Sequence, residues 1–227
     1  MSSLVSCIMP TWNRKEYIGA AVDSWLKQTY ENRELIILDD GDGDGNFSMV
    51  HPRIQHIRNY PRELTGTKRN HCCALAQGEI ICHFDTDDWS APNRIADQVA
   101  RLQGFRKPVT GYSVLLYWDI VKQEAKRYRA SIPGYVVGAT MTYLKSWWED
   151  HQFPDQQEAS DNAIIFPNLR EIEASPDPSH MVARIHGNNV SPKTGIKEIV
   201  PREMVPAEFW ENERLRANGN GQLNHDI

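Results

Sequence analysis

The sequence has no long hydrophobic run and no recognisable export signal. At most about five of its 227 residues in a row are apolar, whereas roughly 20 are needed to cross a bilayer. Residues 1–10 lack both the basic segment and the long apolar segment of a secretory signal peptide. We therefore expect a cytoplasmic protein without a transmembrane segment.

Cysteine is also scarce. The chain has Cys7, Cys72, Cys73 and Cys82, and none of them forms a Cys-x-x-Cys pair. Structural zinc sites need such ligand spacing, and disulfides are rare in the cytoplasm. We expect reduced structural thiols and no zinc site.

An excess of positive charge is absent as well. The formal net charge is −5 and the isoelectric point is about 5.9, which argues against a general polyanion-binding protein. A local basic pocket is compatible with this balance, so a nucleic-acid acceptor is allowed by the sequence but not indicated by it. The length suits one domain with its own hydrophobic core.

What the sequence does have is an unusual glycine-aspartate repeat, Leu-Asp-Asp-Gly-Asp-Gly-Asp-Gly-Asn, at residues 38–46. As an EF-hand loop starting at Asp40, it would place His51 where a bidentate Glu is required. Starting at Asp42, it would place Phe47 where the invariant glycine belongs. The repeat also lacks the Gly-x-Gly-x-x-Gly spacing and the apolar helix of a dinucleotide site. We therefore expect no calcium EF-hand.

In the first hundred residues, short apolar runs alternate with segments of helical spacing. The predicted strands cover 5–9, ended by Pro10, then 35–38, 54–57 and 80–84. The predicted helices run from an Asn13 cap to Leu26, from 65 to 76 with Gly78 closing the end, and from Pro92 to 102. This alternation predicts an α/β fold with a parallel sheet and right-handed crossovers.

The second half of the sequence does not continue the regular alternation of strands and helices. It predicts a hairpin from 109–120 and 124–131, short helices at 144–151 and 160–166, and a strand at 181–185. From Pro201 the chain is polar, which predicts a loosely held helix followed by disorder.

An Asp-x-Asp motif follows the predicted strand 80–84. On an extended segment, Asp85 and Asp87 would face the same way and aim two carboxylates at one point. Oxygen pairs of this kind hold Mg²⁺ or Mn²⁺, which often also bind substrate phosphates. The alternative is a solvated acidic turn in which Asp88 caps the next helix.

Two cations lie in the first turn of the helix predicted at 65–76. Lys68 and Arg69 are disfavoured there by the helix dipole, unless they face an anion. Arginine suits recognition of a phosphate or a base edge. The alternative is a solvated helix start.

Together these motifs resemble family 2 glycosyltransferases, in order and in spacing, across about the first 100 residues. The matching segments are Val5-Ser-Cys-Ile-Met-Pro-Thr-Trp-Asn-Arg14, Ser24-Trp-Leu-Lys-Gln-Thr29, Glu34-Leu-Ile-Ile-Leu-Asp-Asp-Gly41, Lys68-Arg-Asn70 and Gly78-Glu-Ile-Ile-Cys-His-Phe-Asp-Thr-Asp-Asp88. The resemblance implies a GT-A fold: a Rossmann-like, mostly parallel central sheet with a smaller acceptor-side half. It also implies a nucleotide-sugar donor, for which UDP is our first choice, and Mn²⁺ or Mg²⁺.

The resemblance further implies a nucleoside pocket. Pro10, Thr11 and Asn13 would line it, and Asp39 would accept a hydrogen bond from the base. The glycine-aspartate repeat replaces the Gly-Ser-Thr-Asp usual in the family, and we interpret it as a turn.

Other residues would hold the rest of the donor. By resemblance, Arg69, with Lys68, would contact the base or the diphosphate, and Asp85 and Asp87 would hold the ribose and the metal. The late His186 would join the metal or the diphosphate, although a lone histidine can equally be structural.

The acceptor-side half departs from the family pattern. Where the family usually has Glu-Asp, this chain has Ser160 followed by Asp161. Asp161 is therefore our candidate for the base that an inverting transfer requires, with Glu158 in reserve. The alternative role for Asp161 is a helix N-cap, which Ser160 could supply equally well.

These observations predict a metal-dependent, inverting glycosyltransferase acting on a hydroxyl of a glycan, a lipid-linked or another acceptor. We expect one domain over 1–200, with a nucleotide-sugar-binding half at 1–103, an acceptor-side half at 104–200 and a polar tail at 201–227. A nucleotidyltransferase is a weaker alternative, because the Gly-x-Gly-Thr-Arg loop is missing after the first strand. A non-catalytic nucleotide-sugar or glycan-binding module is the other.

Overall fold

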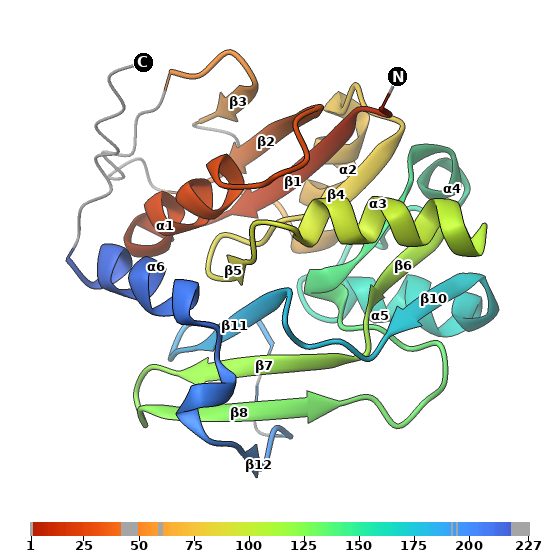
Figure 1. The fold of residues 1–227 in the computed structure, drawn as a ribbon. Coiled ribbons are helices and arrows are strands. Elements are labelled where there is room, and N and C mark those ends of the chain that lie inside the picture. Colours follow the sequence, from red (N-terminus) through yellow and green to blue (C-terminus); the bar gives the residue numbers. More distant parts are fainter. Residues whose placement is uncertain (1, 42–49, 59–60, 192, 194, 219–227) are drawn as a thin grey trace.

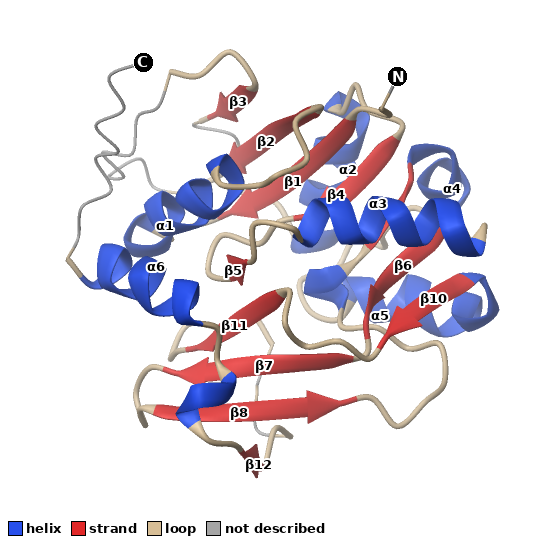
Figure 2. Ribbon diagram, in the orientation of Figure 1, coloured by secondary structure: helices blue, strands red, loops and turns tan. Residues whose placement is uncertain are grey.

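The computed structural model describes residues 2–41, 50–58, 61–191, 193 and 195–218. Its strands form two sheets (Figure 2). A seven-stranded sheet has the order β10-β6-β9-β4-β1-β2-β3, and a five-stranded sheet has the order β12-β8-β7-β11-β5. The larger sheet lies above the smaller one in the view of Figure 1.

The larger sheet is mostly parallel, as the sequence predicts. Parallel pairs join β1 to β2 and β4, β2 to β3, and β6 to β10, while β9 runs antiparallel between β4 and β6. Its strands are β1 (Val5–Thr11), β2 (Arg33–Asp39), β3 (Ile54–Ile57), β4 (Ile80–His83), β6 (Val109–Tyr112), β9 (Thr142–Leu144) and β10 (Ile172–Ser175).

Helices cover both faces of this sheet. Successive residues of a strand point to opposite faces, so Cys7 and Ile8 of β1 enter different cores. The core containing Cys7 also contains apolar side chains of α1 (Lys15–Leu26) and α3 (Arg94–Phe105). The core containing Ile8 contains side chains of α2 (Thr65–Leu75), α4 (Lys145–Asp150) and α5 (Ser160–Ile165). The expected α/β fold with a mostly parallel central sheet is confirmed.

The smaller sheet lies at one end of the larger sheet. Its strands are β5 (Trp89–Ser90), β7 (Val114–Asp119), β8 (Glu124–Arg129), β11 (Met181–Ile185) and β12 (Glu198–Ile199). Among the described residues, 3₁₀ segments lie at η1 (Gly138–Thr140), η2 (Phe166–Glu171) and η3 (Arg202–Met204).

Several predicted boundaries are wrong. Pro10 does not end β1, which continues to Thr11. Asn13 does not cap α1: the helix begins at Lys15, and Asn13 has a positive φ of 49°. Gly78 is not a left-handed cap of α2, because the helix already ends at an extended Ala76.

The predicted run 109–120 is also not one hairpin strand. It divides at Ser113, whose backbone N–H donates to Ser175 O at 2.8 Å. The first part, β6, joins the larger sheet, and the second part, β7, pairs with β8 in the smaller one. The hairpin therefore begins only at Val114.

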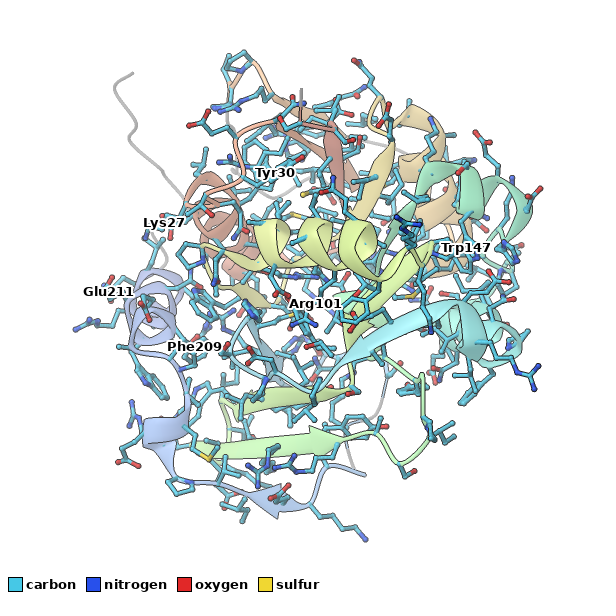
Figure 3. The ribbon with its side chains drawn as sticks, turned by 45° about the vertical axis from the view of Figure 1, so that its right-hand side comes forward. Lys27, Tyr30, Arg101, Trp147, Phe209 and Glu211 are labelled. Atoms are coloured by element: carbon cyan, nitrogen blue, oxygen red, sulfur yellow. The ribbon has the colours of Figure 1, made fainter. Side chains whose placement is uncertain are left out.

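The C-terminal helix is present but is not loosely held. α6 (Ala207–Ala217) lies beside α1 (Figure 1), and Figure 3 shows Phe209 turned toward the body of the protein and Glu211 on the outer side. Phe209 is fully buried. Asn212 is also buried, and its Nδ2 donates to Ala20 O of α1 at 2.8 Å. The disorder expected after α6 falls at 219–227, outside the described residues.

Within the described part of the chain, no helix combines the length and apolarity needed to cross a membrane. The four cysteines are buried thiols. Burial raises the pKa of Cys72 and Cys73.

Candidate active site

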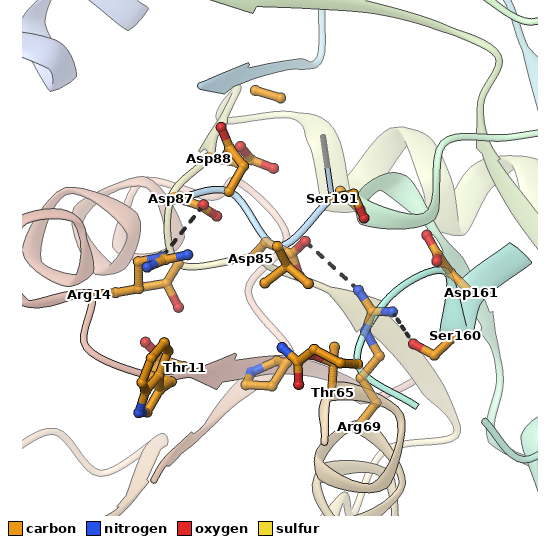
Figure 4. Close-up of a pocket in the computed structure, with 18 of the residues that line it drawn as sticks. Thr11, Arg14, Thr65, Arg69, Asp85, Asp87, Asp88, Ser160, Asp161 and Ser191 are labelled. Atoms are coloured by element: carbon orange, nitrogen blue, oxygen red, sulfur yellow. Dashed lines mark hydrogen bonds and ion pairs between the residues drawn. The ribbon is translucent and has the colours of Figure 1, made fainter. Parts of the chain in front are cut away.

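A pocket opens at the carboxyl ends of β1 and β4 (Figure 4). In an open α/β sheet this edge is where ligands usually bind. Its wall includes the end of β1 and the loop after it, the first turns of α2, the loop after β4, parts of β7 and η1, the start of α5, and β11 with the segment that follows it. Among the lining residues are the predicted Pro10, Thr11, Lys68, Arg69, Asp85, Asp87 and Asp161.

The acidic loop after β4 is a turn. The backbone N–H of Asp88 reaches back to Asp85 O at 3.4 Å, so the extended geometry assumed for the Asp-x-Asp motif is wrong. Asp85 and Asp87 line the same pocket, but they meet different cations. Asp85 Oδ2 lies 4.0 Å from Arg69 Nη2, and Asp87 Oδ2 lies 3.7 Å from Arg14 Nε (Figure 4).

His186 lies against Asp87. Its Nδ1 accepts the backbone N–H of Asn188 at 3.2 Å, so we place the proton on Nε2, which donates to Asp87 Oδ2 at 2.8 Å. Burial opposes ionisation of Asp87, but the hydrogen bond from His186 and the charge of Arg14 outweigh it and hold the pKa of Asp87 below its ordinary value. The structure thus brings together two of the three predicted metal ligands.

These residues suit a metal that is shared with a substrate. Among the residues described, no group of three His, Cys, Asp or Glu side chains is arranged to hold an ion. Asp87 and His186 Nε2 nevertheless lie side by side, and Nε2 would become a nitrogen ligand by giving up the proton that it donates to Asp87. Mg²⁺ and similar ions are commonly bound by one or two carboxylates together with substrate phosphates, so the pair fits that kind of site and not a cage made by the protein alone.

Lys68 is engaged inside the protein. Its ammonium forms a buried ion pair with Asp40 and donates to Thr11 O at 3.0 Å. Asp40 also accepts the backbone N–H of Glu63 at 2.9 Å and lies 3.3 Å from Arg62 Nη1. Lys68 therefore connects the ends of β1 and β2 to α2, and its charge is already balanced by Asp40. The sequence did not distinguish this role from contact with a ligand.

Asp39 and Asn13 lie around Gly41. A Cβ added at Gly41 would be 2.7 Å from Asn13 Oδ1 and 3.1 Å from Asp39 Oδ1. Asp39 also accepts the N–H of Gly41 at 3.0 Å. Burial opposes its ionisation, but the nearby His56, whose Nε2 lies 3.8 Å from Asp39 Oδ2, and the hydrogen bond from Gly41 hold its pKa below the ordinary value. The glycine-aspartate repeat after Gly41 lies outside the described residues.

Asp161 and Glu158 occupy different surroundings. Asp161 lines the pocket, and its carboxylate packs against the backbone of Gly138. Glu158 is exposed and is not among the residues that line the pocket. Neither Ser160 nor Asp161 caps α5, because the N-cap position is Ala159 and the helix has no side-chain cap hydrogen bond. Ser160 instead accepts from Arg69 Nη1 at 3.1 Å, which connects α2 to α5 (Figure 4).

Several residues of the site were not assigned a ligand-binding role by sequence reasoning, among them Trp12, Arg14, Asp88 and Arg184. Trp12 is 40% exposed at the pocket mouth, with the guanidinium of Arg62 stacked 4.0 Å from its ring centre. Arg14 reaches Asp87 and also donates to Asn188 O. Asp88 and Arg184 line the pocket and join each other, since the backbone N–H of Arg184 donates to Asp88 Oδ1 at 3.1 Å. The motif segments contain Trp12, Arg14 and Asp88, but nothing in the sequence pairs them with residues after 180.

Comparison with known proteins identifies the family. The model of the family described as "Glycosyl transferase family 2" matches residues 6–166. The chain belongs to glycosyl transferase family 2. The match includes the β1 loop, the acidic loop and Asp161, but ends before His186.

Curated relatives support the same assignment. The chain is 32% identical over 136 residues to "Putative glycosyltransferase EpsE" of Bacillus subtilis, an alignment that covers 57% of this chain and 49% of EpsE. It is 38% identical over 106 residues to "Putative colanic acid biosynthesis glycosyl transferase WcaA" of Escherichia coli, covering 44% of this chain and 38% of WcaA. The matched segment therefore spans about half or less of these relatives.

Solved structures show the same fold. A crystal structure of S. aureus TarS 1-349 in complex with UDP superposes with a TM-score of 0.65 at 20% identity, covering 99% of this chain and 67% of that chain. This likeness confirms the GT-A-like α/β fold expected from the sequence.

Proposed function

We propose that this protein transfers a sugar from a nucleotide-diphosphate donor, UDP-linked by preference, to an acceptor hydroxyl, with inversion and with a divalent metal. The observation that carries the proposal is the arrangement across one pocket. Asp85, Asp87 and Arg69 line a part of the pocket that would be the donor side, and Asp161 lines it from the start of α5. A carboxylate facing a phosphate-binding wall is what an in-line displacement at a sugar carbon requires.

The donor side would hold the nucleotide and its diphosphate. Asp39 and Asn13 would contact the base, Arg69 would bind diphosphate oxygens, and Asp87 with His186 would hold the metal. When bound, Mn²⁺ or Mg²⁺ would neutralise the charge that develops on the leaving diphosphate. Arg69 Nη2 and Asp85 Oδ2 lie 4.0 Å apart, so the positive and negative charges of this wall partly balance each other before the donor binds.

Asp161 would act on the acceptor. It would take the proton from the acceptor hydroxyl as the oxygen attacks the anomeric carbon, and the sugar–diphosphate bond would break on the opposite face. The close packing of its carboxylate on Gly138 supports this role, because it fixes where the proton-accepting oxygen lies.

The donor and acceptor classes rest on relatives. WfaP of Escherichia coli, described as a "UDP-Glc:alpha-D-GlcNAc-diphosphoundecaprenol beta-1,3-glucosyltransferase", is 35% identical over 100 residues, covering 42% of this chain and 40% of WfaP. TarS structures contain UDP or UDP-GlcNAc. We therefore propose a UDP-sugar donor and a glycan or lipid-linked acceptor. We also propose that the protein acts in the cytoplasm, where nucleotide sugars are available.

A thermal-shift screen tests the donor assignment. UDP, GDP and their sugar conjugates are compared with and without Mn²⁺, since a ligand that binds only the folded state raises Tm. We expect UDP with Mn²⁺ to give the largest rise. No rise with any nucleotide diphosphate would overturn the proposal.

A second assay separates an enzyme from a binding module. Slow release of UDP from a UDP-sugar, lost in Asp161→Asn while UDP still binds, supports catalysis. Binding without any release, even with a panel of glycan acceptors, would favour the non-catalytic module instead. Release of pyrophosphate from a nucleoside triphosphate would favour a nucleotidyltransferase.

A further inference from the structure

A buried arginine connects α6 to the acidic loop. Arg184 of β11 has a fully buried side chain. Its Nε donates to Glu213 Oε2 at 2.6 Å, its Nη2 to Asn212 Oδ1 at 2.9 Å and its Nη1 to the backbone oxygen of Asp87 at 3.1 Å. Its own N–H donates to Asp88 Oδ1. Burying a guanidinium, which stays charged, is costly unless it is paired, and Glu213 is the carboxylate that pairs it.

Glu213 also begins a second series of contacts that leads to the same loop. One turn further along α6, Arg216 Nη2 donates to Glu213 Oε1 at 2.6 Å. The Arg216 guanidinium lies 5.4 Å from the ring centre of Tyr17, and Tyr17 stacks on His186 at 4.8 Å. His186 in turn donates to Asp87 Oδ2 at 2.8 Å. One route therefore ends on the backbone of Asp87 and the other on its carboxylate.

We infer that Glu213 is a positioning residue for Asp87. It orients Arg184 and Arg216, which together fix the main chain and the side-chain rotamer of Asp87 from two directions. The effect on donor binding rests on the function proposed above, whereas the effect on the shape of the acidic loop does not. The C-terminal helix is then part of the donor site, although none of its residues lines the pocket.

The acidic loop needs such support. Phe84 still donates its N–H to Ile8 O of β1 at 2.9 Å. Residues 85–88 follow it and belong to neither β4 nor β5, so ladder hydrogen bonds do not hold them. Carboxylates that bind metals depend on partners behind them for orientation, and loss of such a partner typically weakens metal affinity by about 10- to 100-fold. α6 can act as a fixed support because Phe209 and Asn212 anchor it in the body of the protein.

The test compares Glu213→Gln with Glu211→Gln. Both variants remove one negative charge from α6, but Glu211 is exposed on the outer side of the helix. Hydrogen–deuterium exchange of the peptide covering 84–90 is measured without nucleotide or metal. Calorimetry then gives the UDP affinity in EDTA and in Mn²⁺, and Tm gives the overall stability of each variant.

For Glu213→Gln we expect faster hydrogen–deuterium exchange of residues 84–90 than in the wild type. We also expect the increase in UDP affinity on adding Mn²⁺ to be about 10- to 100-fold smaller than in the wild type. The affinity in EDTA should change less than about twofold, an effect too small to indicate a lost contact. Arg216→Gln, which breaks one route only, should be intermediate, and Glu211→Gln should match the wild type.

Unchanged exchange of residues 84–90 in Glu213→Gln would overturn the inference, whatever the nucleotide data show. Faster exchange with an unaltered gain from Mn²⁺ would also overturn it, because Asp87 would then be positioned without Glu213. If the wild type binds no nucleotide diphosphate, the proposed function fails on its own, and the exchange data still decide whether Glu213 shapes the loop. A general loss of structure would appear as faster exchange in β1 and β4 as well, and would count against a specific role.

Discussion

The carboxylate of Asp161 lies so close to Gly138 that a Cβ added there would be 1.4 Å from Oδ2. No residue larger than glycine can occupy position 138 while Asp161 keeps this rotamer. The side-chain position of Asp161, the second residue of α5, therefore depends on having a glycine at the first residue of η1.

Gly138→Ala should consequently impair turnover without abolishing folding. The added methyl group would displace a side-chain carboxylate, and a misplacement of about 1 Å at a reacting group can reduce the rate by about 100-fold. We expect a fall of this order in the rate of UDP release and an unchanged UDP Kd. Gly104→Ala is the matched control, since a Cβ at Gly104 meets nothing within 4 Å. Full activity in Gly138→Ala would show that the position of Asp161 is unimportant.

Asp87→Ala should remove the metal-dependent part of UDP binding. Asp87 is the carboxylate that contacts both His186 and Arg14, so its loss removes the only oxygen ligand of the proposed pair. The fold should persist, because Asp87 lies in a loop outside the sheet. Calorimetry with EDTA and with Mn²⁺ measures the difference, and Asp150→Ala on the exposed end of α4 is the control. Equal binding by the wild type in EDTA and in Mn²⁺ would refute the metal assignment itself.

Asp39→Ala should weaken UDP binding by roughly 1 to 3 kcal/mol, the scale for removing a hydrogen bond to a charged group. Asp39 lies with Asn13 beside Gly41, at the end of β2. Asp42→Ala and Asp44→Ala, in the repeat that lies outside the described residues, should be near neutral. A calcium-dependent rise in Tm that these two variants lose would instead support a calcium loop.

Acid stability should depend on Asp119 at the end of β7. Burial opposes its ionisation, but the ammonium of Lys126 and two backbone N–H groups hold its pKa below the ordinary value. Because the folded pKa is the lower one, the stabilisation is present above the unfolded pKa of about 3.9 and is lost as the pH falls through the folded value. Urea unfolding should show Asp119→Asn about 1 to 3 kcal/mol less stable at pH 7. The difference should shrink below about pH 4, and a constant difference would contradict it.

Much of the larger sheet could be predicted because β1, β2 and β4 are mostly buried and apolar. The strands at 54–57 and 181–185 have the predicted limits, and the acidic and basic motifs of the first half lie around one pocket. These features depend on local patterns, which a single sequence displays directly. The family resemblance added the roles, which remain proposals.

The long-range pairings could not be predicted. Lys68 pairs with Asp40, 28 residues away in the sequence, and Arg184 pairs with Glu213, 29 residues away. Neither pairing produces a periodic pattern that could be recognised in the sequence. The tail from Pro201 has a polar sequence, yet its helix is anchored by one buried aromatic residue, Phe209, and one buried amide, Asn212. Polarity alone therefore gave the wrong expectation for α6. The division of the run 109–120 at Ser113 is set by pairing with β10, which lies about sixty residues later in the chain.

The last prediction concerns which carboxylate is the base. Asp161 lies in the first turn of α5 and lines the pocket, whereas Glu158 is exposed. An ionised Asp is a weak base in water, but it can accept the proton while the new bond forms, because the hydroxyl becomes acidic only in the transition state. Removing such a base typically lowers the rate by about 10²- to 10⁴-fold.

Asp161→Asn keeps the size of the side chain, and no cap hydrogen bond is lost, because Asp161 makes none. We therefore expect a large fall in kcat, a nearly unchanged donor Kd and an unchanged Tm, while Glu158→Gln should retain activity. Measuring UDP release, UDP binding and thermal unfolding for both variants gives the comparison. Activity retained in Asp161→Asn and lost in Glu158→Gln would move the base to Glu158 and require the loop before α5 to rearrange on acceptor binding. Early melting of Asp161→Asn would instead mean that its packing on Gly138 is structural, and the catalytic carboxylate would then have to be sought elsewhere around the pocket.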